Sequence, residues 1–128
     1  MDHHVLLVDD EVEITRVLSY ALKRHLQIKA TSFNSAEDAL AAMKGIGHDI
    51  SVVVSDLRMP GMDGIRFIRA LRDQGHTMPV IVSSGYITDA ERAQGEALGV
   101  AVWLQKPFDL RTLAQHVRAA LVPQQGDL

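Results

Sequence analysis

Five short apolar runs alternate along this chain with five stretches whose apolar residues recur at helical spacing. The runs occupy residues 4–9, 28–33, 50–55, 80–84 and 100–104. Their length, and the β-branched residues in most of them, are typical of strands. The stretches near residues 12–25, 36–44, 64–72, 88–98 and 110–121 are predicted to be helices. This alternation indicates an α/β fold in which helices cover both faces of a parallel sheet.

The polarity of the runs predicts the order of the strands. Residues 28–33 are more polar than the other runs, which is typical of an edge strand. Residues 50–55 form the most apolar run and are expected at the centre of the sheet. With right-handed crossovers, these positions favour the order 2-1-3-4-5, that of a single doubly wound (βα)5 flavodoxin-like domain. The first and third strands are then neighbours.

Composition limits the class of protein. The 128 residues fit one domain, expected over residues 1–122, with residues 123–128 as a C-terminal tail or linker. The absence of cysteine excludes disulfides and thiolate metal sites. No apolar run approaches the ~20 residues of a membrane span, and the N-terminus does not resemble a signal peptide, so we expect a cytoplasmic protein without membrane insertion. A net charge of -3 predicts no direct nucleic acid binding by this domain.

Helical periodicity predicts which residues face the sheet and which end the helices. The first helix is expected to bury Val17, Leu18, Ala21 and Leu22, and the second Ala36, Ala39, Leu40 and Met43. Asn34 or Ser35 should cap the second helix, which Gly45 and Gly47 should end. Asp63 and Asp109 are the expected caps of the third and fifth helices.

Two further helical features concern the outer surface. Arg66, Arg69 and Arg72 recur at every third position and are expected to form a solvated face. Gly95 lies inside the fourth predicted helix, where glycine costs about 1 kcal/mol relative to alanine. We therefore expect residues 88–98 to form the least stable helix and the natural moving part of the domain.

Four of the five apolar runs end in polar residues able to do chemistry. Asp9 and Asp10 close the first run, Asp56 closes the third, Ser84 closes the fourth, and Lys106 follows the fifth. The carboxyl ends of parallel strands meet at one edge of a sheet, so these side chains are expected to converge there. Taken singly, each has a more ordinary interpretation, such as a helix cap or a turn residue, and only the combination predicts a site.

Three converging carboxylates require a cation. Each ionised pair at about 4 Å and an effective dielectric constant of about 20 repels by about 4 kcal/mol. Oxygen ligands favour Mg²⁺, with Mn²⁺ as a possible substitute. Lys106 and Ser84 beside such a metal would suit a phosphoryl group, whose oxygens they would contact. Asp56 would then be the nucleophile that forms an acyl phosphate.

At this point the chain resembles the receiver domain of two-component response regulators, including the chemotaxis receivers. The resemblance rests on Asp9-Asp10, on Asp-Leu-Arg-Met-Pro-Gly-Met-Asp-Gly from residue 56, on Ser84-Gly85 and on Lys106-Pro107-Phe108. It extends from about Val5 to Leu121. The joint spacing of these motifs is specific to the family, whereas no single motif would be.

The resemblance implies a role for each matching residue in binding metal and phosphoryl group. Asp56 matches the phosphoacceptor, Asp10 matches the direct Mg²⁺ ligand, and Asp9 is expected to act largely through metal-bound water. The backbone carbonyl of Arg58 matches the remaining protein ligand. Lys106 matches the lysine that contacts the phosphoryl group.

Other matching positions concern switching. Ser84 corresponds to the switch hydroxyl, and Gly85, often alanine in relatives, should widen access to the phosphoryl group. Trp103 stands where the family usually has the tyrosine or phenylalanine that turns inward, and the indole is bulkier and carries an N–H group. The peptide bond before Pro107 is expected to be cis. Arg58 and Tyr86 occupy positions that tune hydrolysis of the acyl phosphate.

The resemblance implies a signalling switch that catalyses only its own aspartyl phosphorylation and dephosphorylation. The expected phosphodonor is a sensor histidine kinase or a histidine phosphotransfer protein. The surface of the fourth helix, fifth strand and fifth helix is expected to meet an output domain or protein. Charged residues on these helices could pair across a homodimer or equally face water, namely Arg92, Glu96, Arg111 and Arg118.

Two alternatives belong to other functional classes. A phosphatase or phosphotransferase of the haloacid dehalogenase type also uses an aspartyl phosphate and Mg²⁺. It carries a second aspartate two residues after the nucleophile, where this chain has Arg58, and it needs a substrate-binding cap domain, which we do not expect beside the single predicted domain. The other alternative is a receiver-shaped interaction module that works without phosphate. Trp103 keeps it open, and an Asp56→Asn protein that retained all partner binding would favour it.

Overall fold

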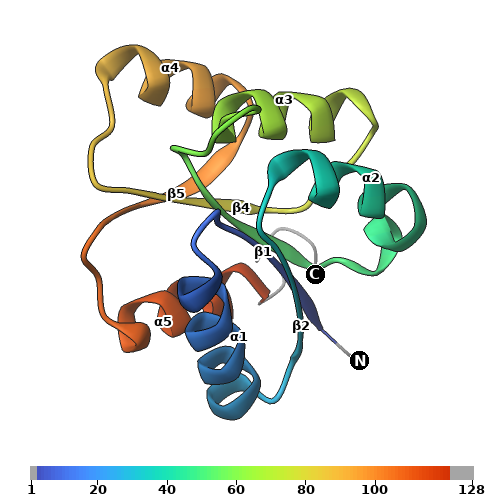
Figure 1. Ribbon diagram of the computed structural model, residues 1–128, viewed down its shortest axis with the longest axis vertical. Coiled ribbons are helices and arrows are strands. Elements are labelled where there is room, and N and C mark those ends of the chain that lie inside the picture. Colours follow the sequence, from blue (N-terminus) through green and yellow to red (C-terminus); the bar gives the residue numbers. More distant parts are fainter. Residues whose placement is uncertain (1–2, 122–128) are drawn as a thin grey trace, which may run out of the picture.

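The computed structural model describes residues 3–121, which form a five-stranded parallel sheet in the order β2-β1-β3-β4-β5 (Figure 1). The strands are β1 (His4–Val8), β2 (Lys29–Phe33), β3 (Val52–Asp56), β4 (Val80–Ser84) and β5 (Val100–Gln105). The helices are α1 (Val12–Leu26), α2 (Ala36–Ile46), α3 (Gly64–Asp73), α4 (Asp89–Ala97) and α5 (Leu110–Leu121), with a 3₁₀ turn at Gly47–Asp49. The predicted fold class and strand order are confirmed. Predicted elements differ from these by one or two residues at their ends. The expected tail at residues 123–128 lies outside the described residues.

Helices cover both faces of the sheet, as Figure 1 shows. Helices α1 and α5 lie on one face, and α2, α3 and α4 lie on the other. Alternate residues of each strand point to opposite faces. Leu6 and Val8 of β1 therefore join a core with Phe67 of α3, whereas Val5 and Leu7 join a second core with α1 and α5. Both cores are built on the same five strands.

The sheet positions the candidate site through its register. β2 lies at an edge and is only partly buried, whereas every residue of the central strand β3 is buried. Val8 pairs with Ser55, which brings the last residues of β1 and β3 side by side. The chain leaves β1 toward one face and β3 toward the other, so a crevice is expected beyond these two strand ends.

Two details of the predicted helices α1 and α2 are wrong. Leu18, Ala21 and Leu22 are buried as predicted, but Val17 is 51% exposed, because it lies to the side of the buried stripe. Gly45 lies inside α2 and does not end it. The helix instead tightens into the 3₁₀ turn that begins at Gly47.

The predicted caps are present, but one predicted surface arginine is not solvated. Ser35 Oγ, Asp63 Oδ1 and Asp109 Oδ1 each accept a hydrogen bond from a backbone N–H in the first turn of the helix they precede. Arg66 and Arg69 are exposed, whereas Arg72 is partly buried. Its guanidinium donates to the backbone carbonyls of Leu98, His76 and Met78 at 2.8–3.1 Å. Arg72 therefore fastens the end of α4 to α3. Among residues 3–121, no helix is long and apolar enough to cross a membrane.

Candidate functional site

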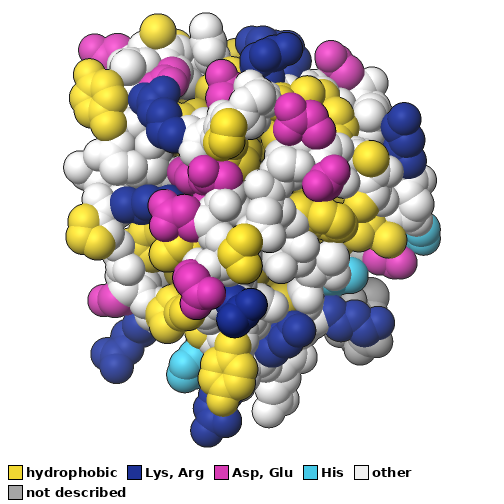
Figure 2. Space-filling model, in the orientation of Figure 1, with side chains coloured by type: hydrophobic (Ala, Val, Ile, Leu, Met, Phe, Trp, Pro, Cys, Tyr) yellow, Lys and Arg dark blue, Asp and Glu magenta, His cyan; other side chains and the backbone are white. Residues whose placement is uncertain are grey.

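Three carboxylates meet at the carboxyl ends of β1 and β3. Asp9, Asp10 and Asp56 each present one oxygen, and these oxygens lie within 4.8 Å of one another. Asp9 and Asp56 are buried, with 4% and 5% of their surface exposed, whereas Asp10 is exposed. The predicted convergence of these side chains is therefore observed. On the face shown in Figure 2, acidic side chains are spread over much of the surface, and several Lys and Arg side chains lie along the lower edge. Hard oxygen donors with one side open to solvent fit a divalent cation.

Lys106 joins this cluster from the end of β5. Its Nζ lies 3.2 Å from Asp9 Oδ2 and 3.3 Å from Asp56 Oδ2. The backbone supports this position, because Lys106 N donates to the Ser84 carbonyl at 2.8 Å. The peptide bond from Lys106 to Pro107 is cis. One ammonium therefore bridges two of the three carboxylates.

The ionisation of these groups reflects their crowding. Burial is the main factor that raises the pKa of Asp56, and the charge of Asp9 raises it further, whereas Lys106 and the Leu57 N–H oppose both effects. Burial alone would lower the pKa of Lys106, but the carboxylates of Asp56 and Asp9 outweigh it and raise the pKa. One ammonium does not fully compensate the buried acids, so a further cation would stabilise them.

The loop after β3 packs tightly against Asp56. Leu57 N donates to Asp56 Oδ1 at 2.8 Å and thereby orients the carboxylate. Gly64 N donates to the Leu57 carbonyl at 2.9 Å, which folds the loop back onto the strand end. A Cβ at Gly64 would lie 2.5 Å from the Asp56 carbonyl oxygen, so this close approach requires glycine. The sequence prediction did not assign Gly64 a role, although the residue ends the quoted motif.

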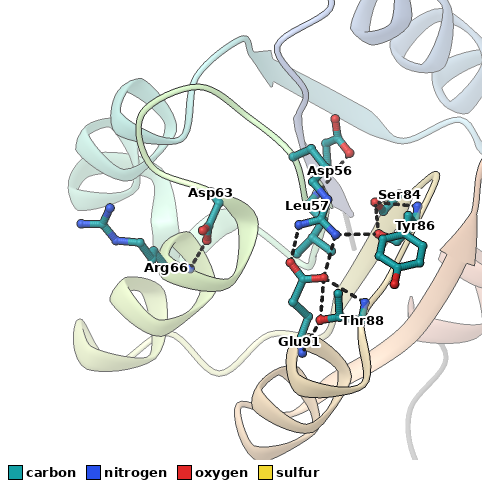
Figure 3. Close-up of polar contacts among 9 residues, drawn as sticks. Asp56, Leu57, Asp63, Arg66, Ser84, Tyr86, Thr88 and Glu91 are labelled. Carbon is teal, nitrogen blue, oxygen red and sulfur yellow. Dashed lines mark hydrogen bonds and ion pairs between the residues drawn. The ribbon is translucent and has the colours of Figure 1, made fainter.

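Ser84 lies at the end of β4 and is fully buried. Its Oγ donates to the Tyr86 carbonyl at 2.8 Å and accepts from Tyr86 N at 3.2 Å (Figure 3). The hydroxyl is therefore engaged by the loop that follows β4. Tyr86 is 67% exposed, and a Cβ at Gly85 would meet no atom within 4 Å. Open space therefore adjoins Ser84.

The Arg58 side chain contacts the start of α4. Its two terminal nitrogens pair with the two carboxylate oxygens of Glu91, and Nη2 also donates to the Tyr86 carbonyl at 3.0 Å. The guanidinium carbon lies 6.0 Å from the centroid of the Tyr86 ring. Glu91 was not among the predicted site residues. Its place three residues after Thr88 signals a capping box, but no sequence signal links it to Arg58.

Trp103 is partly buried between β5 and α4. The edge of its indole packs against Gly95, where a Cβ would lie 2.3 Å from Cη2. The guanidinium carbon of Arg92 lies 5.1 Å from the centroid of the indole ring, within the range of a cation–π contact. Gly95 therefore leaves room for the indole, a role that helix propensity alone did not suggest.

Comparison with known proteins identifies the family. A sequence model of the response regulator receiver domain matches residues 5–118. The uncharacterized transcriptional regulatory protein YkoG of Bacillus subtilis is 31% identical over 118 residues, which cover 92% of this chain and 50% of that protein. Response regulator MprA of Mycobacterium leprae is 32% identical over 118 residues, which cover 91% and 50% respectively. The chain thus spans about half the length of the curated relatives it matches.

A solved structure gives the same result. The chemotaxis protein CheY4 of Vibrio cholerae is 28% identical and superimposes with a TM-score of 0.85, covering 94% of this chain and 100% of the CheY4 chain. The family match, the strand order and the acidic cluster at the strand ends agree. The chain belongs to the family of response regulator receiver domains.

Proposed function

We propose that this domain is a phosphorylation-activated receiver of a two-component or phosphorelay pathway, with Asp56 as the phosphoacceptor. The observation that carries the proposal is the cluster, open to solvent at Asp10, in which the oxygens of Asp9, Asp10 and Asp56 lie within 4.8 Å of one another. Lys106 Nζ lies 3.3 Å from Asp56 on the same cluster. A nucleophilic carboxylate, a metal-ligand set and an ammonium are thereby combined.

Mg²⁺ is the proposed cofactor, and Mn²⁺ is a possible substitute. Asp9, Asp10 and Asp56, together with the backbone carbonyl of Arg58, would hold it. When bound, the metal would supply positive charge to the oxygens of the transferring phosphoryl group. Asp56 would supply the nucleophile, and Lys106 would supply a second positive charge.

The proposed reaction is transfer from a phosphohistidine of a sensor histidine kinase or a histidine phosphotransfer protein. A carboxylate oxygen of Asp56 attacks phosphorus, the P–N bond breaks, and the imidazole leaves with the bonding electrons. Lys106 would neutralise charge on the phosphoryl oxygens. Attack of water on phosphorus later breaks the acyl phosphate P–O bond and restores the Asp56 carboxylate. The domain is thus a switch that acts on itself.

Switching is proposed to begin at Ser84. A phosphoryl group on Asp56 offers new acceptors, so the Ser84 hydroxyl would exchange the Tyr86 carbonyl for a phosphoryl oxygen. Gly85 adds no side chain to the space beside Ser84. Movement at the end of β4 would then change the packing of Trp103 and the surface of α4, β5 and α5. This surface is the proposed contact with an output domain or protein. We expect neither direct nucleic acid binding by this domain nor insertion in a membrane, and a cytoplasmic location stays a prediction.

Two secondary proposals follow from particular residues. Exposed charges on α4 and α5 would allow a homodimer, namely Arg92, Glu96, Arg111 and Arg118. The packing of Trp103 against Gly95 and Arg92 favours the alternative of a phosphate-independent interaction module, if the indole cannot repack. A change in Trp103 fluorescence on phosphorylation distinguishes this alternative from a working switch.

Intact mass spectrometry after incubation with acetyl phosphate tests the proposed function. We expect one phosphoryl adduct that requires both Mg²⁺ and Asp56, with Asp56→Asn as the control. An adduct on the Asp56→Asn protein, or no adduct on the original protein with Mg²⁺ present, contradicts the proposal. The second result makes the interaction module the leading interpretation.

A further inference from the structure

Helix α4 makes polar contacts with the rest of the domain at both of its ends. Gly95 is its one buried residue among Asp89–Ala97. Two arginines of α3 and its preceding loop fasten its two ends. Arg58 pairs with Glu91 near the first turn, and Arg72 Nε donates to the Leu98 carbonyl, just after the last turn, at 2.8 Å. Arg58 also contacts the Tyr86 carbonyl in the loop before α4, whereas Arg72 also contacts the carbonyls of His76 and Met78 after α3.

The contact between Arg58 and Glu91 is a two-pronged ion pair. Nη1 and Nη2 of Arg58 reach different oxygens of the Glu91 carboxylate, and the Nη2–Oε1 distance is 2.7 Å. Side-chain exposure is 50% for Arg58 and 20% for Glu91, so the pair is partly shielded from water. The hydrogen bond from Arg58 is the largest of the effects that lower the pKa of Glu91. A bidentate ion pair of this kind fixes the relative orientation of the guanidinium and the carboxylate in addition to its electrostatic attraction.

Glu91 also belongs to the N-terminal cap of α4. Its Oε1 accepts from Thr88 N at 2.9 Å and from Thr88 Oγ1 at 3.0 Å, while Thr88 Oγ1 accepts from Glu91 N (Figure 3). The same carboxylate therefore caps the helix and binds Arg58. A displacement of the first turn of α4 away from Arg58 would stretch the ion pair, whereas the cap contacts lie within the turn and would move with it.

The ion pair connects to Ser84 through one carbonyl. The Tyr86 carbonyl accepts from Ser84 Oγ at 2.8 Å (Figure 3). It also accepts from Arg58 Nη2 at 3.0 Å. If Ser84 turned toward Asp56, the Tyr86 N–H would lose its partner and the Tyr86 carbonyl would keep only Arg58, so fewer contacts would hold this loop. Arg58 donates a hydrogen bond to the Tyr86 carbonyl, and the ion pair with Glu91 holds Arg58 in place. The loop that contains Tyr86 is therefore restrained.

We propose that the Arg58–Glu91 pair is a latch that holds the β4–α4 loop, residues 85–88, in the conformation in which Ser84 is bound to Tyr86. Glu91 is then a positioning residue that opposes switching at a distance from the phosphoacceptor. The inference rests on the proposed function, because it assumes that Ser84 turns toward a phosphoryl group on Asp56. Loss of the latch lowers the cost of the switched conformation and increases its population.

The variants that test the latch are Glu91→Gln, Arg58→Gln and the two combined. Glutamine at position 91 can still accept from Thr88, as in other capping boxes, so Glu91→Gln removes the ion pair and keeps the helix cap. The matched control is Arg72→Gln, which loosens the other end of α4. Arg72 donates its hydrogen bonds to the carbonyls of Leu98, His76 and Met78 and not to the β4–α4 loop.

The first readout is amide hydrogen exchange of residues 85–88 in the unphosphorylated, metal-free protein. We expect Glu91→Gln and Arg58→Gln each to speed exchange in this loop by about 3- to 5-fold, the loss of one partly exposed ion pair. The double variant should add little beyond either single change, because both remove the same contact. Arg72→Gln should leave the loop unchanged.

The second readout is the acetyl phosphate concentration that gives half of the Trp103 fluorescence change. We expect it to fall by a similar factor of about 3 to 5 in the latch variants. Unchanged exchange in Glu91→Gln, an equal effect of Arg72→Gln, or additive effects of the two latch changes would overturn the latch. If the original protein forms no phosphoryl adduct, the proposed function fails, and hydrogen exchange still decides whether the pair restrains the loop.

Discussion

Replacement of Gly95 by alanine sets two effects of opposite sign against each other inside α4. Alanine at a helix-interior position stabilises by about 1 kcal/mol relative to glycine. The added Cβ would lie 2.3 and 2.4 Å from Cη2 and Cζ2 of Trp103, and 3.2 Å from a methyl carbon of Val100. Carbon atoms prefer about 3.5–4.0 Å, so the overlap with the rigid indole exceeds about 1 Å.

The overlap should decide the sign of the stability change. An indole cannot bend, so the whole ring must shift or α4 must move away. Overpacking of this kind costs about 1–3 kcal/mol. After subtraction of the gain of about 1 kcal/mol from helix propensity, we expect Gly95→Ala to destabilise the domain by up to about 2 kcal/mol. Urea unfolding monitored by circular dichroism measures this change, and Trp103 emission reports the displaced ring.

The matched control is Gly45→Ala in α2. Gly45 is also helical but exposed, and a Cβ there would meet no atom within 4 Å. The same substitution should therefore stabilise the domain by up to about 1 kcal/mol and leave Trp103 emission unchanged. If Gly95→Ala were stabilising to the same degree, with unchanged emission, the packing argument for Gly95 would be refuted.

Three further predictions concern charge. Asp56→Asn should stabilise the metal-free domain at neutral pH, because burial and Asp9 raise the pKa of Asp56 and so disfavour the ionised form. Urea unfolding should show this gain decline as pH falls through the raised pKa of the folded protein and be absent below the ordinary carboxyl pKa of about 3.9. Mg²⁺ at about ten times its Kd should stabilise the domain by about 1.4 kcal/mol, and chelation or Asp10→Asn should remove this gain in thermal unfolding. His4 Nε2 lies 2.6 Å from Thr31 Oγ1, and burial lowers the pKa of the His4 imidazole. The neutral imidazole should therefore stabilise the fold fully above about pH 6.5, and this stabilisation should decline as pH falls below that value. His4→Gln should flatten this part of the pH–stability curve.

Each of these predictions has a result that contradicts it. A less stable Asp56→Asn protein at neutral pH would mean that the ion pair with Lys106 outweighs burial and repulsion. Equal stabilisation by Mg²⁺ in the Asp10→Asn protein would place the metal elsewhere. A pH–stability curve that is unchanged by His4→Gln would assign the titration near pH 6.5 to other groups.

The fold could be predicted from the sequence because the polarity of the apolar runs indicates which strands lie at the edge and at the centre of the sheet. The polar run 28–33 marks the edge strand, and the apolar run 50–55 marks the centre, which places the ends of the first and third strands together. Convergence of Asp9, Asp10 and Asp56 follows from that order alone. The apolar pattern of the strands predicts their order and places their ends to within one or two residues.

Side-chain partners were less predictable. Arg72 has the spacing of a surface residue, and its three carbonyl partners lie on segments that pattern analysis does not bring together. Glu91 and Arg58 are 33 positions apart and meet only through the loops that join sheet and helices. Gly95 is read from sequence as a weak helix position, whereas the indole of Trp103 explains it. Contacts between loops and helix ends depend on packing that local patterns do not encode.

The most direct test of the account is to locate the phosphoryl group on the chain. Borohydride reduction of the protein after treatment with acetyl phosphate and Mg²⁺ converts an acyl phosphate to an alcohol, and peptide mass spectrometry then identifies the modified residue. We predict that only residue 56 is modified. This modification should be absent without Mg²⁺ and in the Asp56→Asn protein. Modification at Asp9 or Asp10 instead, or none at residue 56, would contradict the assignment of Asp56 as the phosphoacceptor.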